Sequence, residues 1–131
     1  MPFRSVLPRS SAPDPTLNRV RKLCLSLPES SETSSWGHPN FRAGKRTFVA
    51  FEWVKGQAAI AFRLPQADIA TWSEVPGFFA TPYGQGKWLS LAVNRRPNWK
   101  HIESLVLRSY KTVALNRMLD ALKQAHDRGN M

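Results

Sequence analysis

The sequence predicts an α+β fold in which helices cover one face of an antiparallel β-sheet. Strand-like alternation of apolar residues is concentrated in the middle of the chain, in neighbouring runs separated by two-residue turns, and helical periodicity lies towards both ends. No internal repeat is present, and 131 residues are enough to bury one core but not two. Adjacent hairpins with helices grouped at the ends are typical of this layered arrangement. We expect one domain over residues 17–125, between a flexible arm (1–16) and a tail (126–131).

The first helix is predicted to follow Thr16, a suitable N-cap. Apolar residues then recur at helical spacing until Pro28 ends the pattern, at Leu17, Val20, Leu23, Cys24 and Leu27. We expect Cys24 to be a buried thiol of this helix. The arm before it contains four prolines and no apolar run that resembles a signal peptide, and a transit peptide is the alternative interpretation of this segment.

Three strands are predicted next. Residues 29–35 are all Ser, Glu or Thr, so we expect an exposed loop there. A period of two then predicts strands at Phe41–Ala43, Thr47–Val54 and Ala58–Leu64. The dipeptides Gly44-Lys45 and Lys55-Gly56 supply the turns between them, which gives two consecutive hairpins.

The second half of the chain is predicted to be mostly helical. A short helix is expected over residues 65–75, where a Pro-Gly pair ends it. Residues 78–87 are rich in Gly, Pro and aromatic residues and precede the last predicted strand, Trp88–Val93. Two helices complete the chain, one from Asn98 to Val113 and one from Leu115 to Leu122. The predicted order is therefore helix, three strands, helix, strand and two helices.

Composition excludes several classes of protein. A single cysteine allows no internal disulfide and no Cys-based zinc or iron–sulfur site, and it favours a reducing compartment, so we expect a cytoplasmic protein. The longest apolar run, residues 58–62, is far shorter than the ~20 residues of a membrane-spanning helix, so no membrane partner is expected. Phosphate-loop, dinucleotide-binding, nucleophile-elbow and zinc-protease motifs are absent. Carboxylates and histidines are scattered, so we expect no enzyme, cofactor or metal.

The net charge of +10 is concentrated in three segments. Residues 17–27 carry +3, and residues 41–64 and 95–111 carry +4 each. Cations at hairpin turns and at the start of a helix suit a polyanion, although each residue taken singly is also explained as a solvated surface charge. We expect phosphate contacts from Arg42, Lys45, Arg46, Lys55, Lys87, Arg95, Arg96 and Lys100.

A second hypothesis places a small-molecule or enzymatic pocket near His38, Tyr83 and Lys87. Tyr83 and Lys87 flank a glycine turn, and His38 lies in a loop, where such sites are common. The glycines are also explained as a simple turn, since the run Gly84-Gln85-Gly86-Lys87 precedes a strand rather than a helix. An acidic protein that meets the basic face is a third possibility, which the sequence does not separate from nucleic acid.

Two sets of loop residues carry a family resemblance. The first set is Leu25-Ser26-Leu27-Pro28-Glu29, Trp36-Gly37-His38-Pro39-Asn40-Phe41-Arg42, Gly44-Lys45 and Phe48. The second set is Phe79-Ala80-Thr81-Pro82-Tyr83-Gly84, Gly86-Lys87-Trp88-Leu89-Ser90-Leu91, Trp99, Ser109-Tyr110 and Val113-Ala114. Together they resemble the MmcQ/YjbR-like family over about residues 17–122. The Pro-Tyr-Gly-x-Gly-Lys-Trp run with the downstream Ser-Tyr is the most specific part.

This resemblance implies a fold related to the frataxin-like sheet arrangement, described as a double-wing DNA-binding domain in which two β-hairpins act as wings. It also implies a bacterial protein with a suspected role in DNA binding. The motif positions carried over are Trp36, His38, Pro39, Phe41, Lys45, Phe48, Pro82, Tyr83, Lys87, Trp88, Trp99, Ser109 and Tyr110. We expect the aromatic members to pack in the core. Charge and resemblance together predict a non-enzymatic domain that binds DNA through hairpin tips and the neighbouring helix surface.

Overall fold

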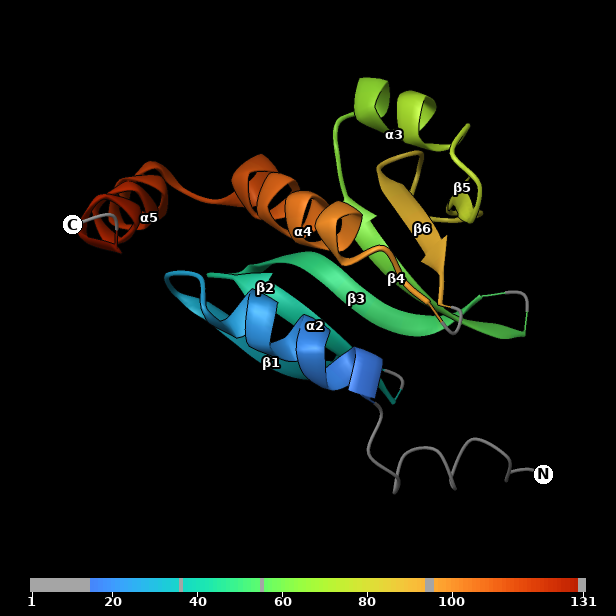
Figure 1. Cartoon of the computed structure of the whole chain (residues 1–131), viewed down its shortest axis with the longest axis horizontal. Helices are drawn as coiled ribbons and strands as arrows, with labels where there is room; N and C mark the ends of the chain where they lie inside the picture. The colour runs from blue at the N-terminus through green and yellow to red at the C-terminus, as the bar shows by residue number, and fades with distance from the viewer. Residues whose placement is uncertain (1–14, 36, 55, 94–95, 130–131) are drawn as a thin grey trace.

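The computed structural model describes residues 15–35, 37–54, 56–93 and 96–129. Their strands form one six-stranded antiparallel sheet in the order β1-β2-β3-β4-β6-β5 (Figure 1). The strands are β1 (Ser30–Ser35), β2 (His38–Ala43), β3 (Arg46–Val54), β4 (Gln57–Arg63), β5 (Phe78–Ala80) and β6 (Trp88–Ala92). The helices of the described residues are α2 (Pro15–Leu25), α3 (Gln66–Trp72), α4 (Trp99–Val113) and α5 (Asn116–Gly129). The predicted α+β fold with an antiparallel sheet is confirmed.

Large apolar side chains line one face of the sheet. The strand register places four fully buried residues in one row across β2, β3, β4 and β6, namely Phe41, Val49, Phe62 and Leu89. They share one core with buried residues of all four described helices, including Val20, Ile69, Ile102 and Met118. Cys24 is buried in the same core, as predicted, and burial raises the pKa of its thiol. Helices therefore cover this face of the sheet.

The opposite face carries small side chains. Ala50, Ala61 and Ser90 form the neighbouring row across β3, β4 and β6, because successive residues of a strand point to opposite faces. All three are buried although they do not belong to the core beneath the helices. Their short side chains leave space above this face, and the segment between β5 and β6 encloses part of that space.

Two strands differ from the sequence prediction. Residues 29–35 are not a loop, because residues 30–35 form β1 and all six pair with β2. Most of the β1 side chains are exposed, so backbone pairing rather than side-chain burial holds the strand, and its uniformly polar sequence carries no periodic signal. The three-residue strand β5, which pairs with β6, is also missing from the prediction.

The other elements lie close to their predicted positions. β2 begins at His38, before the predicted start. The register between β2 and β3 shifts between Phe41 and Arg42, and this bulge brings both Phe48 and Val49 of β3 into the core. The last helix continues past Leu122 to Gly129. The predicted flexible arm lies outside the described residues as far as residue 14. Its last two residues, Pro15 and Thr16, belong to α2, so the helix begins before the predicted N-cap Thr16. Among the helices that the structure describes, none has the length and apolar character needed to cross a membrane.

Tyr110 joins α4 to the segment that connects α2 with β1. Its ring is fully buried and packs edge-on against Phe48, with ring centroids 5.5 Å apart. The phenol donates a hydrogen bond of 2.6 Å to the carbonyl oxygen of Pro28. Burial, followed by the nearby carboxylate of Glu29, raises the pKa of Tyr110, so the phenol keeps its proton and remains a donor.

Replacing Tyr110 with Phe should lower the free energy of unfolding by about 1–2 kcal/mol, because the Pro28 carbonyl loses its donor while the ring stays packed. Urea denaturation at pH 7 measures this difference. Thr112→Val is a suitable control, since it removes a hydrogen bond to the Arg108 carbonyl at an exposed position and should cost less than about 0.5 kcal/mol. Equal losses in the two variants would contradict a special role for the Tyr110 bond.

Candidate functional site

A pocket of about 300 Å³ lies on the face of the sheet opposite the helices. Its floor includes the short side chains of Ala50 and Ala61, and polar and aromatic side chains surround them. Strands β1, β2, β3, β4 and β6 all contribute, together with the segment between β5 and β6. The larger side chains of the lining are Asn40, Thr47, Glu52, Thr81, Tyr83 and Trp88. This combination of aromatic walls and a few polar groups is typical of small-ligand sites.

Glu52 and Tyr83 meet at this pocket. The hydroxyl of Tyr83 donates a hydrogen bond to Oε2 of Glu52, which connects the β5–β6 segment to β3. Glu52 is half-buried, and burial raises the pKa of its carboxyl group. Among the described residues Tyr83 is its one hydrogen-bond partner, so the carboxylate keeps acceptor capacity for a further donor. Among all the residues that the structure describes, no group of three or more His, Cys, Asp or Glu side chains is placed to hold a metal ion.

Hydrogen bonds fold the segment before β6 back onto the sheet. The backbone N–H of Thr81 donates to the carbonyl of Trp88 at 3.1 Å, and the N–H of Lys87 donates to the carbonyl of Gly84 at 3.2 Å. Below them, the hydroxyls of Thr81 and Ser90 form a buried hydrogen bond of 2.7 Å. These contacts fix both ends of the segment relative to the pocket.

Gly84 lets the indole of Trp88 approach the backbone closely. Its φ is +86°, in the left-handed region that favours glycine, and a Cβ atom there would lie 2.6 Å from Cδ1 of Trp88. The Pro-Tyr-Gly-x-Gly-Lys-Trp run therefore folds so that Tyr83 and Trp88 both line the pocket.

The structure brings one of the three predicted pocket residues to this site. Tyr83 lines the pocket, whereas His38 and Lys87 are not among the described residues that do so. The expectation that the motif aromatics pack in the core is wrong for Tyr83, which is 52% exposed, and for Trp88, which lines the pocket and lies outside the core. Trp36 lies outside the described residues. Sequence reasoning also missed Glu52 and Trp88 as pocket residues. The one available signal was that Glu52 follows Ala50 on the same face of a predicted strand.

Among the described residues, the cations predicted to contact DNA fall into two groups at opposite ends of β3. Lys45 occupies the β2–β3 turn, and Arg46 is the first residue of β3. Lys87 precedes β6 at the same end, where its carbonyl accepts a hydrogen bond from the N–H after β4. Arg96 and Lys100 follow β6, whose last residues lie beside the β3–β4 turn at the other end. Two further predicted contacts, Lys55 and Arg95, lie outside the described residues.

Arg42 has a partly structural role at the β2–β3 turn. Its Nη2 donates a hydrogen bond to the carbonyl oxygen of Lys45, and its half-buried side chain covers this end of the sheet. Its Nε atom is buried without a hydrogen-bond partner among the described residues. The guanidinium group therefore holds the turn as well as adding positive charge to it.

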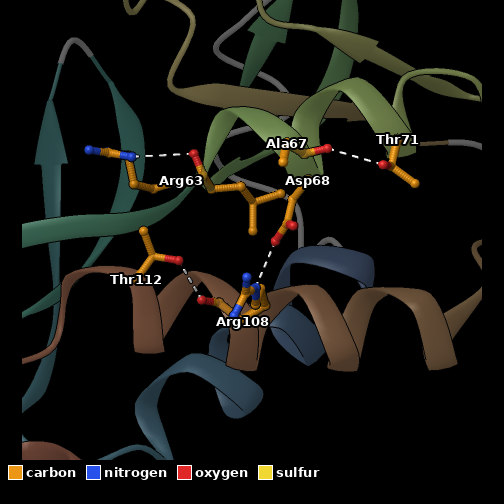
Figure 2. A network of polar contacts seen from close by, with 7 residues as sticks. Arg63, Ala67, Asp68, Thr71, Arg108 and Thr112 are labelled. Carbon is orange, nitrogen blue, oxygen red and sulfur yellow. Dashed lines mark hydrogen bonds and ion pairs between the residues drawn. The ribbon is translucent and has the colours of Figure 1, made fainter.

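Ion pairs neutralise four arginines of the helices. The four pairs of the described residues are Arg19–Glu103, Arg21–Glu32, Arg108–Asp68 and Arg117–Glu29. Figure 2 shows one of them, in which Nε of Arg108 lies 2.6 Å from Oδ2 of Asp68 and joins α4 to α3. Within the described chain, the exposed side chains of Lys45, Arg46 and Lys87 take part in no ion pair. Positive charge is thus left unbalanced at one end of the sheet.

Comparison with known proteins gives a family and a fold. The family model described as YjbR matches residues 25–112. A Pseudomonas syringae protein solved as a structural genomics target has a TM-score of 0.60 and 13% identity, with 73% of this chain and 96% of that chain covered. A Deinococcus radiodurans protein with a DUF419 domain has a TM-score of 0.64 and 14% identity, with 83% of this chain and 86% of that chain covered. No protein with a curated function matches the sequence significantly.

Gly84→Ala should lower the free energy of unfolding more than Gly37→Ala does. Both glycines have left-handed φ values, +86° and +79°, so each alanine costs about 1–2 kcal/mol in backbone strain. At Gly37 an added Cβ meets nothing within 4 Å, whereas at Gly84 it meets Trp88. We expect a further loss of about 1–3 kcal/mol for Gly84→Ala, measured by urea denaturation. Equal losses would show that the indole is not packed on this glycine.

Glu52→Gln should raise the free energy of unfolding at pH 7, and the gain should disappear near pH 4. Burial raises the pKa of Glu52, so the fold favours the protonated carboxyl group. That contribution is present below the unfolded pKa of about 4.3 and is lost as the pH rises through the folded pKa. Glutamine remains neutral and still offers an oxygen to Tyr83.

Urea denaturation at pH 4 and pH 7 tests this expectation for Glu52→Gln. Glu74→Gln is the matched control, because it removes an exposed carboxylate from the turn after α3. The control should show no comparable gain at pH 7. A Glu52→Gln protein less stable than the parent at pH 7 would contradict the assigned cost of burying this carboxylate.

Proposed function

Because the chain belongs to the YjbR family, we propose that it is a non-enzymatic domain that binds DNA phosphates at the β2–β3 end of the sheet. The contacts come from Lys45, Arg46 and Lys87, with Arg42 and Arg63 beside them. The net charge of +10 and the resemblance to double-wing DNA-binding domains support this function. In this arrangement the β2–β3 hairpin acts as one wing.

The grouping of exposed cations at the β2–β3 end carries this proposal. Lys45, Arg46 and Lys87 lie together at this end and have no acidic partner among the described residues. Exposed lysines of the helices that are likewise without an ion pair are spread over α2, α4 and α5, for example Lys22, Lys111 and Lys123. An unbalanced patch of this kind attracts a polyanion over a Debye length of about 8–10 Å. Phosphates bound there release counterions, which gives affinity without base recognition.

The spacing of the strands suits duplex DNA. β2, β3, β4 and β6 are successive neighbours in the sheet, and adjacent strands lie about 4.8 Å apart. The β2–β3 turn and the start of β6 are therefore about 12 Å apart, which is close to the width of the major groove, about 12 Å. Long side chains at the two sides of this patch can reach phosphates on both sides of the groove.

The second group of predicted cations does not extend this patch. β3 has nine residues, so its first and last residues are about 27 Å apart at 3.4 Å per residue. Arg96 and Lys100 lie near the far end. They carry the same charge as Lys45 and Arg46 in a different place, which makes them a suitable control.

Lys45→Ala/Arg46→Ala should weaken binding to a duplex of about 20 base pairs by about tenfold at physiological salt. Loss of two phosphate contacts should also make the log–log salt slope shallower by about 2. Fluorescence anisotropy with labelled duplex, titrated from about 50 to 200 mM salt, measures both quantities. Arg42 is kept in both proteins because it holds the turn.

The control is Arg96→Ala/Lys100→Ala, which removes two charges at the opposite end of β3. It should change the salt slope by less than about 0.5. A parent protein whose affinity does not fall with salt would contradict phosphate binding. Equal effects of the two double variants would contradict the β2–β3 end as the contact, and tight binding to an acidic protein without measurable duplex affinity would contradict DNA as the partner.

A further inference from the structure

The pocket on the helix-free face lies beside the patch that we assign to duplex DNA, and phosphate contacts at the strand ends leave it unused. We propose that this pocket binds a nucleotide, with the base against Tyr83 and Trp88 beside Glu52 and the phosphate towards Arg42 and Lys87. The base we assign is guanine. This inference rests on the proposed function only because both use the cations Arg42 and Lys87.

The pocket differs in charge along its length. Glu52 lies at one end of its β3 lining, and Thr47 lies at the other end, five positions away. Thr47 pairs with Arg42 in the β2–β3 register, and Lys87 lies at the same end of the sheet without lining the pocket. The lining therefore runs over about 17 Å, at 3.4 Å per residue, from a carboxylate to neighbouring cations. A nucleotide has complementary groups in the same order, with hydrogen-bond donors on the base for the carboxylate and a phosphate for the cations.

Glu52 selects for a base with donors on its edge. The carboxylate is acceptor-only when ionised, and its oxygens can accept more bonds than the one from Tyr83. Guanine presents two adjacent donors, N1–H and the exocyclic amino group, which match the two oxygens of a carboxylate. Uracil presents one N–H between two carbonyl oxygens, which a carboxylate repels. Aromatic side chains such as Tyr83 and Trp88 add stacking to either base.

The structure of the pocket is not explained by folding alone. Ala50 and Ala61 keep the floor low in a region that larger side chains would fill. Gly84 adopts a left-handed conformation that brings the indole of Trp88 to the wall, and Tyr83 remains half-exposed above the sheet. A half-buried carboxylate without a cationic partner among the described residues has a cost in stability. These features are expected where an unfilled, polar site is retained for a ligand.

Isothermal titration calorimetry with GMP, UMP and ribose 5-phosphate tests the proposal on the whole chain. The parent should bind GMP at least tenfold more tightly than UMP or ribose 5-phosphate. Glu52→Gln should reduce the preference for GMP over UMP to less than threefold, because the amide places a donor opposite the donors of guanine. The matched control Glu74→Gln, an exposed carboxylate outside the pocket, should keep the full preference.

A second arm distinguishes a free nucleotide from an unpaired nucleotide at the end of a strand. Short single-stranded oligonucleotides ending in guanosine or uridine are compared with GMP and UMP. Preference for guanine in the mononucleotides assigns the free nucleotide, and preference only in the oligonucleotides assigns the strand end. Absence of a guanine preference in both sets, or its survival in Glu52→Gln, would overturn the proposal.

The result is separable from the proposed DNA contact. Lys45→Ala/Arg46→Ala should weaken duplex binding and keep the preference for GMP, since neither residue lines the pocket. Glu52→Gln should keep duplex binding and lose the preference. A protein that fails the duplex test but shows the guanine preference supports the pocket alone, and the opposite result overturns the pocket alone.

Discussion

The different sizes of the side chains on the two faces of β3 and β4 determine how the rest of the chain packs. Phe51 pairs with Ile60 on one face, and Ala50 pairs with Ala61 on the other. Because the side-chain period of a strand is two, a shift of one residue in register would exchange these faces. Four helices bury the face with large residues, and the opposite face keeps a shallow, partly polar pocket. The core and the candidate site are therefore two results of the same alternation.

Electrostatics divides the molecule in a similar way. The carboxylates of Glu29, Glu32, Asp68 and Glu103 accompany arginines of the helices. The strand ends at the β2–β3 turn have no such partners among the described residues, although they belong to the same compact sheet. On the helix-free face, the carboxylate of Glu52 accepts a hydrogen bond from a tyrosine and has no cationic partner among the described residues. The candidate binding surface therefore has a positive part at the β2–β3 end and a negative part at Glu52.

Much of the fold could be predicted from local patterns. Helical periodicity identified the terminal helices, and alternation with Gly-containing turns identified β3, β4 and β6, because these elements bury one side of an amphipathic pattern. β1 has no apolar residue, so no pattern distinguishes it from a loop until β2 pairs with it. The pocket was less predictable. Its motif indicated Tyr83, but Glu52 lies 31 residues earlier in the chain, and only the sheet register and the folded segment before β6 bring the two together.

Strand β1 also affects how this protein behaves beside other copies of itself. It forms one edge of the described sheet, where the outer backbone groups of a strand are open to pairing with another chain. Its single carboxylate, Glu32, is neutralised by Arg21, so charge repulsion gives this edge little protection. What discourages intermolecular strand addition and fibril growth is instead the absence of apolar side chains, since a serine-rich edge offers no dry surface for a second sheet to pack against.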